Sequence, residues 1–300
     1  MSTRDRWLGV GFLVLGVGVA VCAILGPLVL DVIDYRTSVT SLNQIVGADA
    51  AGLVLVAPMS VVAGLLVLAG RPGATLLGLA PAVFVAYTYT LLIVGNEYLD
   101  EPGNVEQFFP LLLGVFILAV ALIVVAWRAS SFEPLPVTSR RVDRVAGFVL
   151  LAVASFIVIG LHLPSYLDSL SEAPTNAGYL SSPTAFWLVK FMDLGIVTPV
   201  ALVAGVGMLL RRPWARRPVY ALLGGYALLG ASVAAMAVTM SATDDPDSSL
   251  GMVAASSVAA LVLIALASYL YRPLLRRDRL IHDLPSLEDQ VPQQFAERSP

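Results

Sequence analysis

Long apolar stretches follow one another along the chain and are separated by short polar segments. Eight of them stand out, near 7–29, 48–70, 74–95, 108–127, 145–164, 185–210, 218–240 and 249–271. At about 1.5 Å per residue, each is long enough to cross about 30 Å of hydrocarbon as an α-helix. The pattern predicts an all-α, polytopic integral membrane protein with eight transmembrane helices.

Composition supports this class, because 58% of the 300 residues are hydrophobic and only 13% are charged. Those fractions lie outside the range of ordinary soluble domains. The first apolar stretch is too long for the core of a signal peptide, so we expect it to stay as a helix. Cys22 is the single cysteine, which excludes an intramolecular disulfide and a thiolate metal cluster.

The polar connections carry a strong charge asymmetry. Arginines gather on one side, at positions 4, 6, 71, 128, 140, 141, 144, 211, 212, 216, 217 and 272, whereas only Arg36 falls on the other. By the positive-inside rule, both termini are expected in the cytoplasm and the protein in the cell membrane. The opposite side is acidic, which would concentrate cations or simply keep a solvated surface.

The chain contains an internal similarity. The segment "DRWLGVG" at 5–11 resembles "DRVAGFV" at 143–149, and residues 49–74 align without a gap with 190–215. The ungapped alignment matches Pro58 with Pro199 and Gly64 with Gly205. Such matches favour a duplication over shared membrane composition.

This similarity predicts a domain organisation of two parallel four-helix repeats. The repeats would span 1–130 and 143–272, joined by a cytoplasmic linker at 131–142 and followed by a disordered cytoplasmic tail at 273–300. Their pseudo-two-fold axis would run along the membrane normal. Pro58 and Pro199 fall mid-span and would kink the second helix of each repeat, which we expect to line the interface between repeats.

Lys190 is the only lysine, and it lies in an otherwise apolar stretch with Asp193 one helical turn later. The repeat alignment places Lys190 on Asp49. We therefore expect Lys190 to contact Asp49 or Asp193. Because Lys190 lies at the outer boundary, where a lysine can snorkel, Asp193 is the ionisable residue we rank first as functional.

Further polar residues lie at a comparable depth, namely Tyr87, Tyr89, Glu97 and His162. If they converge with Asp193, they form an outward-facing pocket for substrate binding or gating. The alternative is a structural clamp between Lys190 and an aspartate.

Several kinds of site are not expected. The two histidines, His162 and His282, fall on opposite sides of the membrane, so they cannot form a metal site together with the lone cysteine. No nucleotide-binding glycine loop, nucleophile elbow or zincin signature occurs. We expect no cofactor, no catalytic residue that can be named and no nucleic-acid partner.

At "VGNEYLDEPGNVEQFFPLLL" and at "FWLVKFMDLGIVTPVALVAGVGMLLRRPWARRPVYALL" the chain resembles a group of uncharacterised multi-pass membrane proteins of high-GC bacteria. The resemblance covers most of the apolar region. It implies a shared topology in the bacterial inner membrane, and it brings no activity and no functional residue with it.

The leading functional hypothesis is that the protein binds or transports a small polar solute or ion from the extracytoplasmic side. Asp193, Lys190 and Asp49 would form a charged gate, with Tyr87, Tyr89 and Glu97 lining the approach. The alternatives are a non-catalytic scaffold that binds other proteins and, less favoured, a membrane-embedded enzyme acting on lipid-linked substrates.

Overall fold

The computed structural model describes residues 3–71, 73–131, 135 and 139–275. Those residues form helices and connections, with no strand among them. Eight of the helices are long and apolar enough to cross a membrane, as the sequence pattern predicted. The linker lies partly outside the described residues, and the tail lies outside them beyond Leu275, together with His282.

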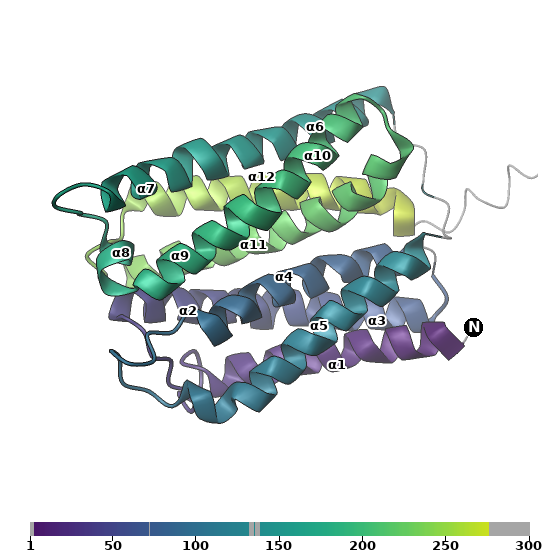
Figure 1. The fold of residues 1–300 in the computed structure, drawn as a ribbon. Coiled ribbons are helices and arrows are strands. Elements are labelled where there is room, and N and C mark those ends of the chain that lie inside the picture. Colours follow the sequence, from purple (N-terminus) through teal and green to yellow (C-terminus); the bar gives the residue numbers. More distant parts are fainter. Residues whose placement is uncertain (1–2, 72, 132–134, 136–138, 276–300) are drawn as a thin grey trace, which may run out of the picture.

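These eight helices are called spans 1 to 8 (Figure 1). Spans 1, 3 and 8 are single helices: α1 (Thr3–Leu25), α4 (Ala74–Val94) and α12 (Leu250–Leu275). Spans 4 and 7 each begin with a short 3-10 turn, η2 (Val105–Phe108) before α5 (Phe109–Ser130) and η5 (Pro213–Ala215) before α11 (Arg216–Ala242).

Spans 2, 5 and 6 each contain a π-helical segment. Span 2 consists of α2 (Val39–Ala51), η1 (Gly52–Val56) and α3 (Ala57–Leu68). Span 5 consists of α6 (Arg140–Ser155), η3 (Phe156–His162) and α7 (Leu163–Ser169), and span 6 of α9 (Pro183–Met192), η4 (Asp193–Val197) and α10 (Thr198–Leu209). A short helix, α8 (Ala177–Ser181), precedes span 6.

Each π segment ends just before a proline. Pro58, Pro164 and Pro199 are the second residues of the helices that follow. Proline has no N–H to donate, and its ring clashes with the carbonyl four residues earlier. The residue before each proline donates five residues back instead, as Thr198 does to Asp193. The π segments therefore accommodate the prolines without breaking the spans.

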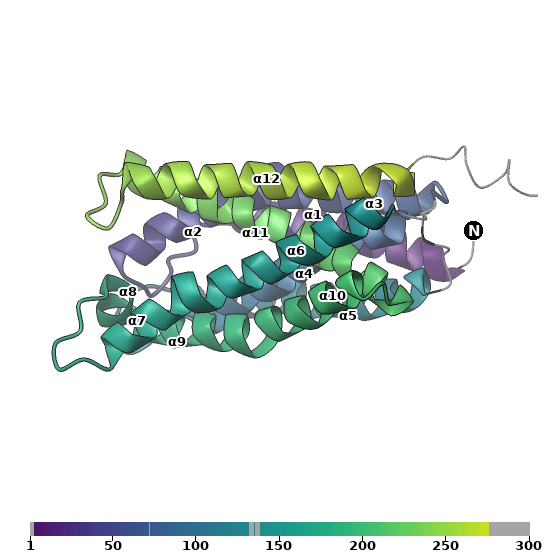
Figure 2. The same ribbon diagram turned by 90° about the horizontal axis from the view of Figure 1, so that it is seen from above.

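The two ends of the bundle differ. One end, the terminal end, carries Thr3 and Leu275, and the opposite end carries the connections at 26–38, 95–104, 170–182 and 243–249 (Figures 1 and 2). We call the latter the loop end. Span 2 reaches it by starting at Val39, nine residues before the predicted 48, because the Ser38 hydroxyl accepts the N–H of Ser41 and caps the helix.

The first four spans pack against one another as one closed group of helices, whereas the last four do not. In the first set, α1 packs against α3 and α5, and α4 packs against both as well. In the second set, α6 packs against α10 and α11 against α12, while α11 also lies along α2 and α4 (Figures 1 and 2). Accordingly α4 and α11 are the most buried spans, and α12 is the most exposed one.

Contact between the two sets differs from the predicted one. Spans 2 and 6 were expected to face each other, but α11 packs against α2 and α4, and α4 packs against α9. The approach of α11 depends on Gly47, because a Cβ there would lie 2.5 Å from the Cα of Met236. Small side chains allow such close packing, so Gly47 lets span 7, rather than span 6, pack against span 2.

Candidate functional site

One buried cluster of ionisable side chains in the apolar helices is centred on Asp193. One of its carboxylate oxygens, Oδ2, lies 2.8 Å from Nε2 of His162, and the other accepts a hydrogen bond of 2.9 Å from the Tyr87 hydroxyl. Asp193 is 8% exposed and His162 is 4% exposed. Spans 3, 5 and 6 each supply one member, so the structure brings together three of the residues singled out in the sequence.

Local backbone structure positions this contact. Asp193 is the first residue of η4, and His162 is the last residue of η3. A π-helical turn holds more residues than an α-helical turn, so it rotates the side chains that follow it around the helix axis. The Asp193–His162 contact thus lies where two π segments meet.

One shared proton gives this pair zero net charge in either of two forms. In one form a protonated histidine donates to a charged carboxylate, and in the other a neutral carboxyl donates to Nε2 of a neutral histidine. Gain or loss of a proton leaves a net charge in a buried site, which is costly. The arrangement can therefore hold one proton and pass it between an acid and a base.

The Lys190 side chain does not form the expected ion pair. Its ammonium donates a 2.9 Å hydrogen bond to the hydroxyl of Ser165 and lies 3.3 Å from the centre of the Phe186 ring. No ion pair to Asp49 or Asp193 occurs among the described residues. Span 2 and span 6 do not face each other at this depth, and His162 and Tyr87 already occupy the Asp193 carboxylate.

Asp49 belongs to a different cluster. It is 8% exposed, and its Oδ2 has no hydrogen-bond partner in the described part of the chain. The buried side chains of Cys22, Tyr35 and Tyr89 surround it. Burial raises the pKa of Tyr35, and the neighbouring Asp49 and Cys22 raise it further. Asp49 and Asp193, two members of the charged gate predicted from the sequence, thus belong to separate clusters.

Tyr89 and Glu97 do not line an approach to Asp193. Tyr87 and Tyr89 are two positions apart on α4, which is about 200° around a helix, so they point to opposite sides. Tyr89 faces Cys22 and Asp49. Glu97 accepts hydrogen bonds of 2.7 Å from both the backbone N–H and the hydroxyl of Thr184, in the first turn of α9. Its carboxylate fastens span 6 to the end of span 3.

Two further residues complete the Asp193 neighbourhood. Tyr226 of α11 places its hydroxyl 3.5 Å from the carbonyl oxygen of Val197, in the π segment. The hydroxyl of Thr198 is buried and has no hydrogen-bond partner among the described residues. Ser165 and Tyr226 were not among the residues predicted from the sequence. The spacing of Ser165 could have predicted its contact with Lys190. Ser165 lies three positions after His162, and Lys190 lies three positions before Asp193, so each is about one helical turn from a member of the Asp193–His162 pair.

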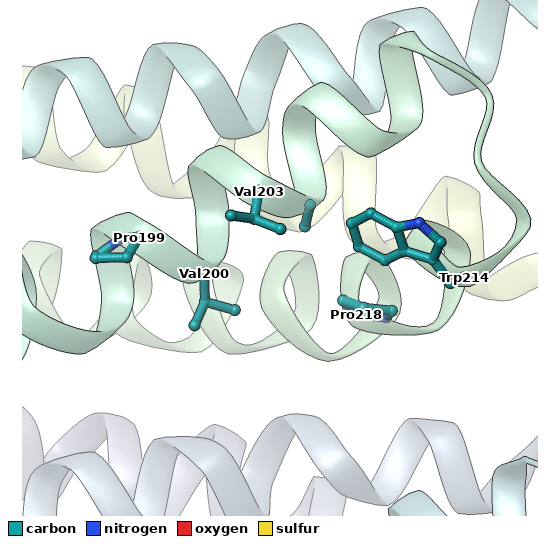
Figure 3. Close-up of a pocket in the computed structure, with 6 residues that line it drawn as sticks. Pro199, Val200, Val203, Trp214 and Pro218 are labelled. Atoms are coloured by element: carbon teal, nitrogen blue, oxygen red, sulfur yellow. The ribbon is translucent and has the colours of Figure 1, made fainter.

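The best-formed hollows do not reach Asp193. One is a shallow apolar groove of about 250 Å³ between α10 and the start of α11, lined by Pro199, Val200, Val203, Ala204, Trp214 and Pro218 (Figure 3). The other is an open depression beside Ile93, Tyr98 and Phe109. The outward-facing pocket expected around Asp193, Tyr87 and His162 is not one of them.

Hydrogen bonds tie the loop end together. Arg36, the arginine predicted to lie apart from the arginine-rich side, pairs with Glu106 through two hydrogen bonds, of 2.6 and 3.0 Å, and donates a third to the carbonyl of Glu101. The hydroxyl of Ser182 lies 2.9 Å from that of Ser38 and 3.0 Å from that of Ser41. The first and last sets of spans therefore meet in several polar contacts at this end.

Asp245 makes a similar contact with span 2. Its carboxylate accepts from the side chains of Asn43, at 2.8 Å, and Thr40, at 3.3 Å. Burial alone would raise the pKa of Asp245, but hydrogen bonds from Asn43, the Asp247 backbone and Thr40 outweigh it and hold that pKa below its ordinary value. The carboxylate form is therefore the one that the fold stabilises.

No group of three or more histidine, cysteine, aspartate or glutamate side chains within the described part of the chain is arranged to hold a metal ion. The comparisons with known proteins add no further assignment. The chain matches no family model, no curated protein and no solved structure.

Proposed function

We propose that the protein is an integral protein of the cell membrane that binds or transports a small polar solute or cation in exchange for a proton carried by Asp193 and His162. The observation that carries the proposal is the buried Asp193–His162–Tyr87 cluster, which joins span 3 to spans 5 and 6. Ionisable residues are costly inside a membrane, so a cluster of them is a functional site by default.

Two neighbouring features support a ligand near Asp193. The cluster lies on two π segments, which occur frequently at functional sites. The unpartnered Thr198 hydroxyl, at the end of η4, is available to a polar ligand. Lys190 stays one turn away on the loop-end side, where it adds positive charge near the cluster without occupying the carboxylate.

The proposal includes a duplication with both termini in the cytoplasm. Supporting it, η1 and η4 occupy equivalent positions in the aligned segments, 52–56 and 193–197. Gly9 lies against the carbonyl of Gly64 as Gly147 lies against that of Gly205, at 3.1 and 2.9 Å from the Cβ that an alanine would add. The arginine-rich side would face the cytoplasm, and the loop end would face outward.

A scaffold function is the second candidate, and it has its own supporting observations. The cluster is closed, and polar contacts such as Glu97 with Thr184 and Asn43 with Asp245 hold the two sets of spans together at the loop end. At the terminal end, Arg217 donates to the carbonyls of Ser130 and Ser131. Under this function, Asp193 would contribute to assembly only through stability.

Proton flux in reconstituted liposomes distinguishes the two functions. The purified protein would be placed in vesicles with an internal pH dye, and sodium, potassium, ammonium and amino-acid gradients would be imposed in turn. We expect one of these gradients to drive proton movement, and Asp193→Asn to reduce the rate at least tenfold.

Asp245→Asn is the matched control, because it is the same substitution at a loop-end carboxylate. It should leave the rate within about twofold. Flux that persists in Asp193→Asn would contradict the proposal. An absence of flux in the parent protein, together with a lowered melting temperature for Asp193→Asn, would favour the scaffold.

A further inference from the structure

Asp49 presents a buried carboxyl group whose Oδ2 has no hydrogen-bond partner among the residues that the structure describes. The residue lies in the last turn of α2, three residues before η1. Its oxygen occupies space that only a glycine leaves open, because a Cβ at Gly26 would lie 2.6 Å from Oδ2. This side chain is thus enclosed on the side of the 26–38 connection as well as by the spans.

The groups that face Asp49 carry no positive charge. They are the Cys22 thiol on α1, the Tyr35 phenol from the 26–38 connection and the Tyr89 phenol on α4. No arginine, lysine or histidine pairs with Asp49 in the part of the chain that the structure describes.

An ionised carboxylate in these surroundings would be a buried charge with neither a counter-ion nor a full set of donors, which folded proteins avoid. A neutral carboxyl removes the charge and leaves a much smaller desolvation cost. Asp193 has histidine as a base beside it, whereas Asp49 has only groups that are themselves weak acids.

We propose that Asp49 is a second proton-binding site, separate from Asp193, whose carboxyl group holds its proton in the folded protein at neutral pH. The ligand of this site is a proton, because no group of three or more histidine, cysteine, aspartate or glutamate side chains among the described residues is arranged around Asp49 to hold a metal ion. The inference is independent of the function proposed for Asp193.

Infrared spectroscopy of the protein in lipid tests the proposal directly, because a protonated carboxyl has a C=O stretch that a carboxylate lacks. The spectrum at pH 7 would be recorded for the parent protein, for Asp49→Asn and for Asp245→Asn. We expect one protonated-carboxyl band to disappear in Asp49→Asn and to remain in Asp245→Asn. An unchanged band in Asp49→Asn would overturn the proposal.

A pair of glycine variants keeps the test decisive if Asp49→Asn does not fold. Gly26→Ala would press a methyl group on Oδ2 and should shift the same band, while Gly52→Ala is the control, because its Cβ would meet only Val19 at an ordinary 3.6 Å. A band that moves in neither variant would contradict the assignment. A carboxylate signal at Asp49 that responds to added sodium or potassium would assign the site to a metal cation instead, and would equally overturn it.

Discussion

Two buried carboxyl groups, Asp193 and Asp49, lie beside π segments of spans 6 and 2 and have different partners. Asp193 accepts from Tyr87 and contacts the imidazole of His162, whereas the Oδ2 of Asp49 has no partner. The two residues are equally buried, at 8% exposure. Burial alone therefore does not decide what a carboxyl group in this fold does. The neighbouring base decides whether it can hold a charge.

Replacing each aspartate by leucine should give the largest difference in stability between the two sites. Asp193→Leu leaves His162 and Tyr87 buried without their partner, so we expect it to lower the free energy of unfolding by about 3–5 kcal/mol. Asp49→Leu removes an unsatisfied oxygen and should change the free energy of unfolding by less than about 1 kcal/mol. Thermal unfolding of both variants in nanodiscs measures the difference. Equal losses would mean that Asp49 has a partner comparable to His162.

The two tyrosines of α4 offer a smaller contrast. Tyr87→Phe removes the donor to Asp193 and should cost about 1–2 kcal/mol of unfolding free energy. Tyr89→Phe is the control on the opposite side of α4, where the hydroxyl has the Cys22 thiol, a weak hydrogen-bonding group, as its neighbour, and it should cost less than half as much. The same unfolding assay applies, and a larger loss for Tyr89→Phe would reverse the comparison.

Asp245 provides the smallest effect and a pH dependence of known sign. Its pKa in the folded protein is below the ordinary value of 3.8. It therefore stabilises the fold fully above that ordinary value, and the contribution is lost as the pH falls through the lower folded pKa. Melting temperatures at pH 6 and pH 3 should differ less for Asp245→Asn than for the parent protein. An identical difference in the two proteins would show that the hydrogen bonds from Asn43 and Thr40 contribute nothing to stability.

Much of the fold could be predicted from the sequence, since hydropathy over about 20 residues locates a helix that can cross a membrane. Eight helices long and apolar enough to cross a membrane are confirmed on this basis. The early start of span 2 was missed because the polar residues after Ser38 resemble a loop, although the serine itself is a capping signal. The duplication and the orientation of the termini stay predictions.

The partners within the site were harder to predict. An alignment of repeats places Lys190 on Asp49, but it cannot say which faces of spans 2 and 6 meet. In the structure, the two sets of spans meet largely through α4 of the first set and α11 of the second. Pairing also depends on local rotation. The π segments change the direction of Asp193 and His162, and a pattern with a fixed period of 3.6 residues does not contain that change.

The π segment η4 links the shape of span 6 to the state of Asp193. Its five residues contain one more than a regular helical path would need, and removing that excess would turn one part of the span about 100° relative to the other. The carboxylate would then point away from His162, and the ring of Pro199 would clash with the carbonyl four residues earlier. The π segment and the acid–base contact are thus one coupled feature, so that a change in either one requires a change in the other.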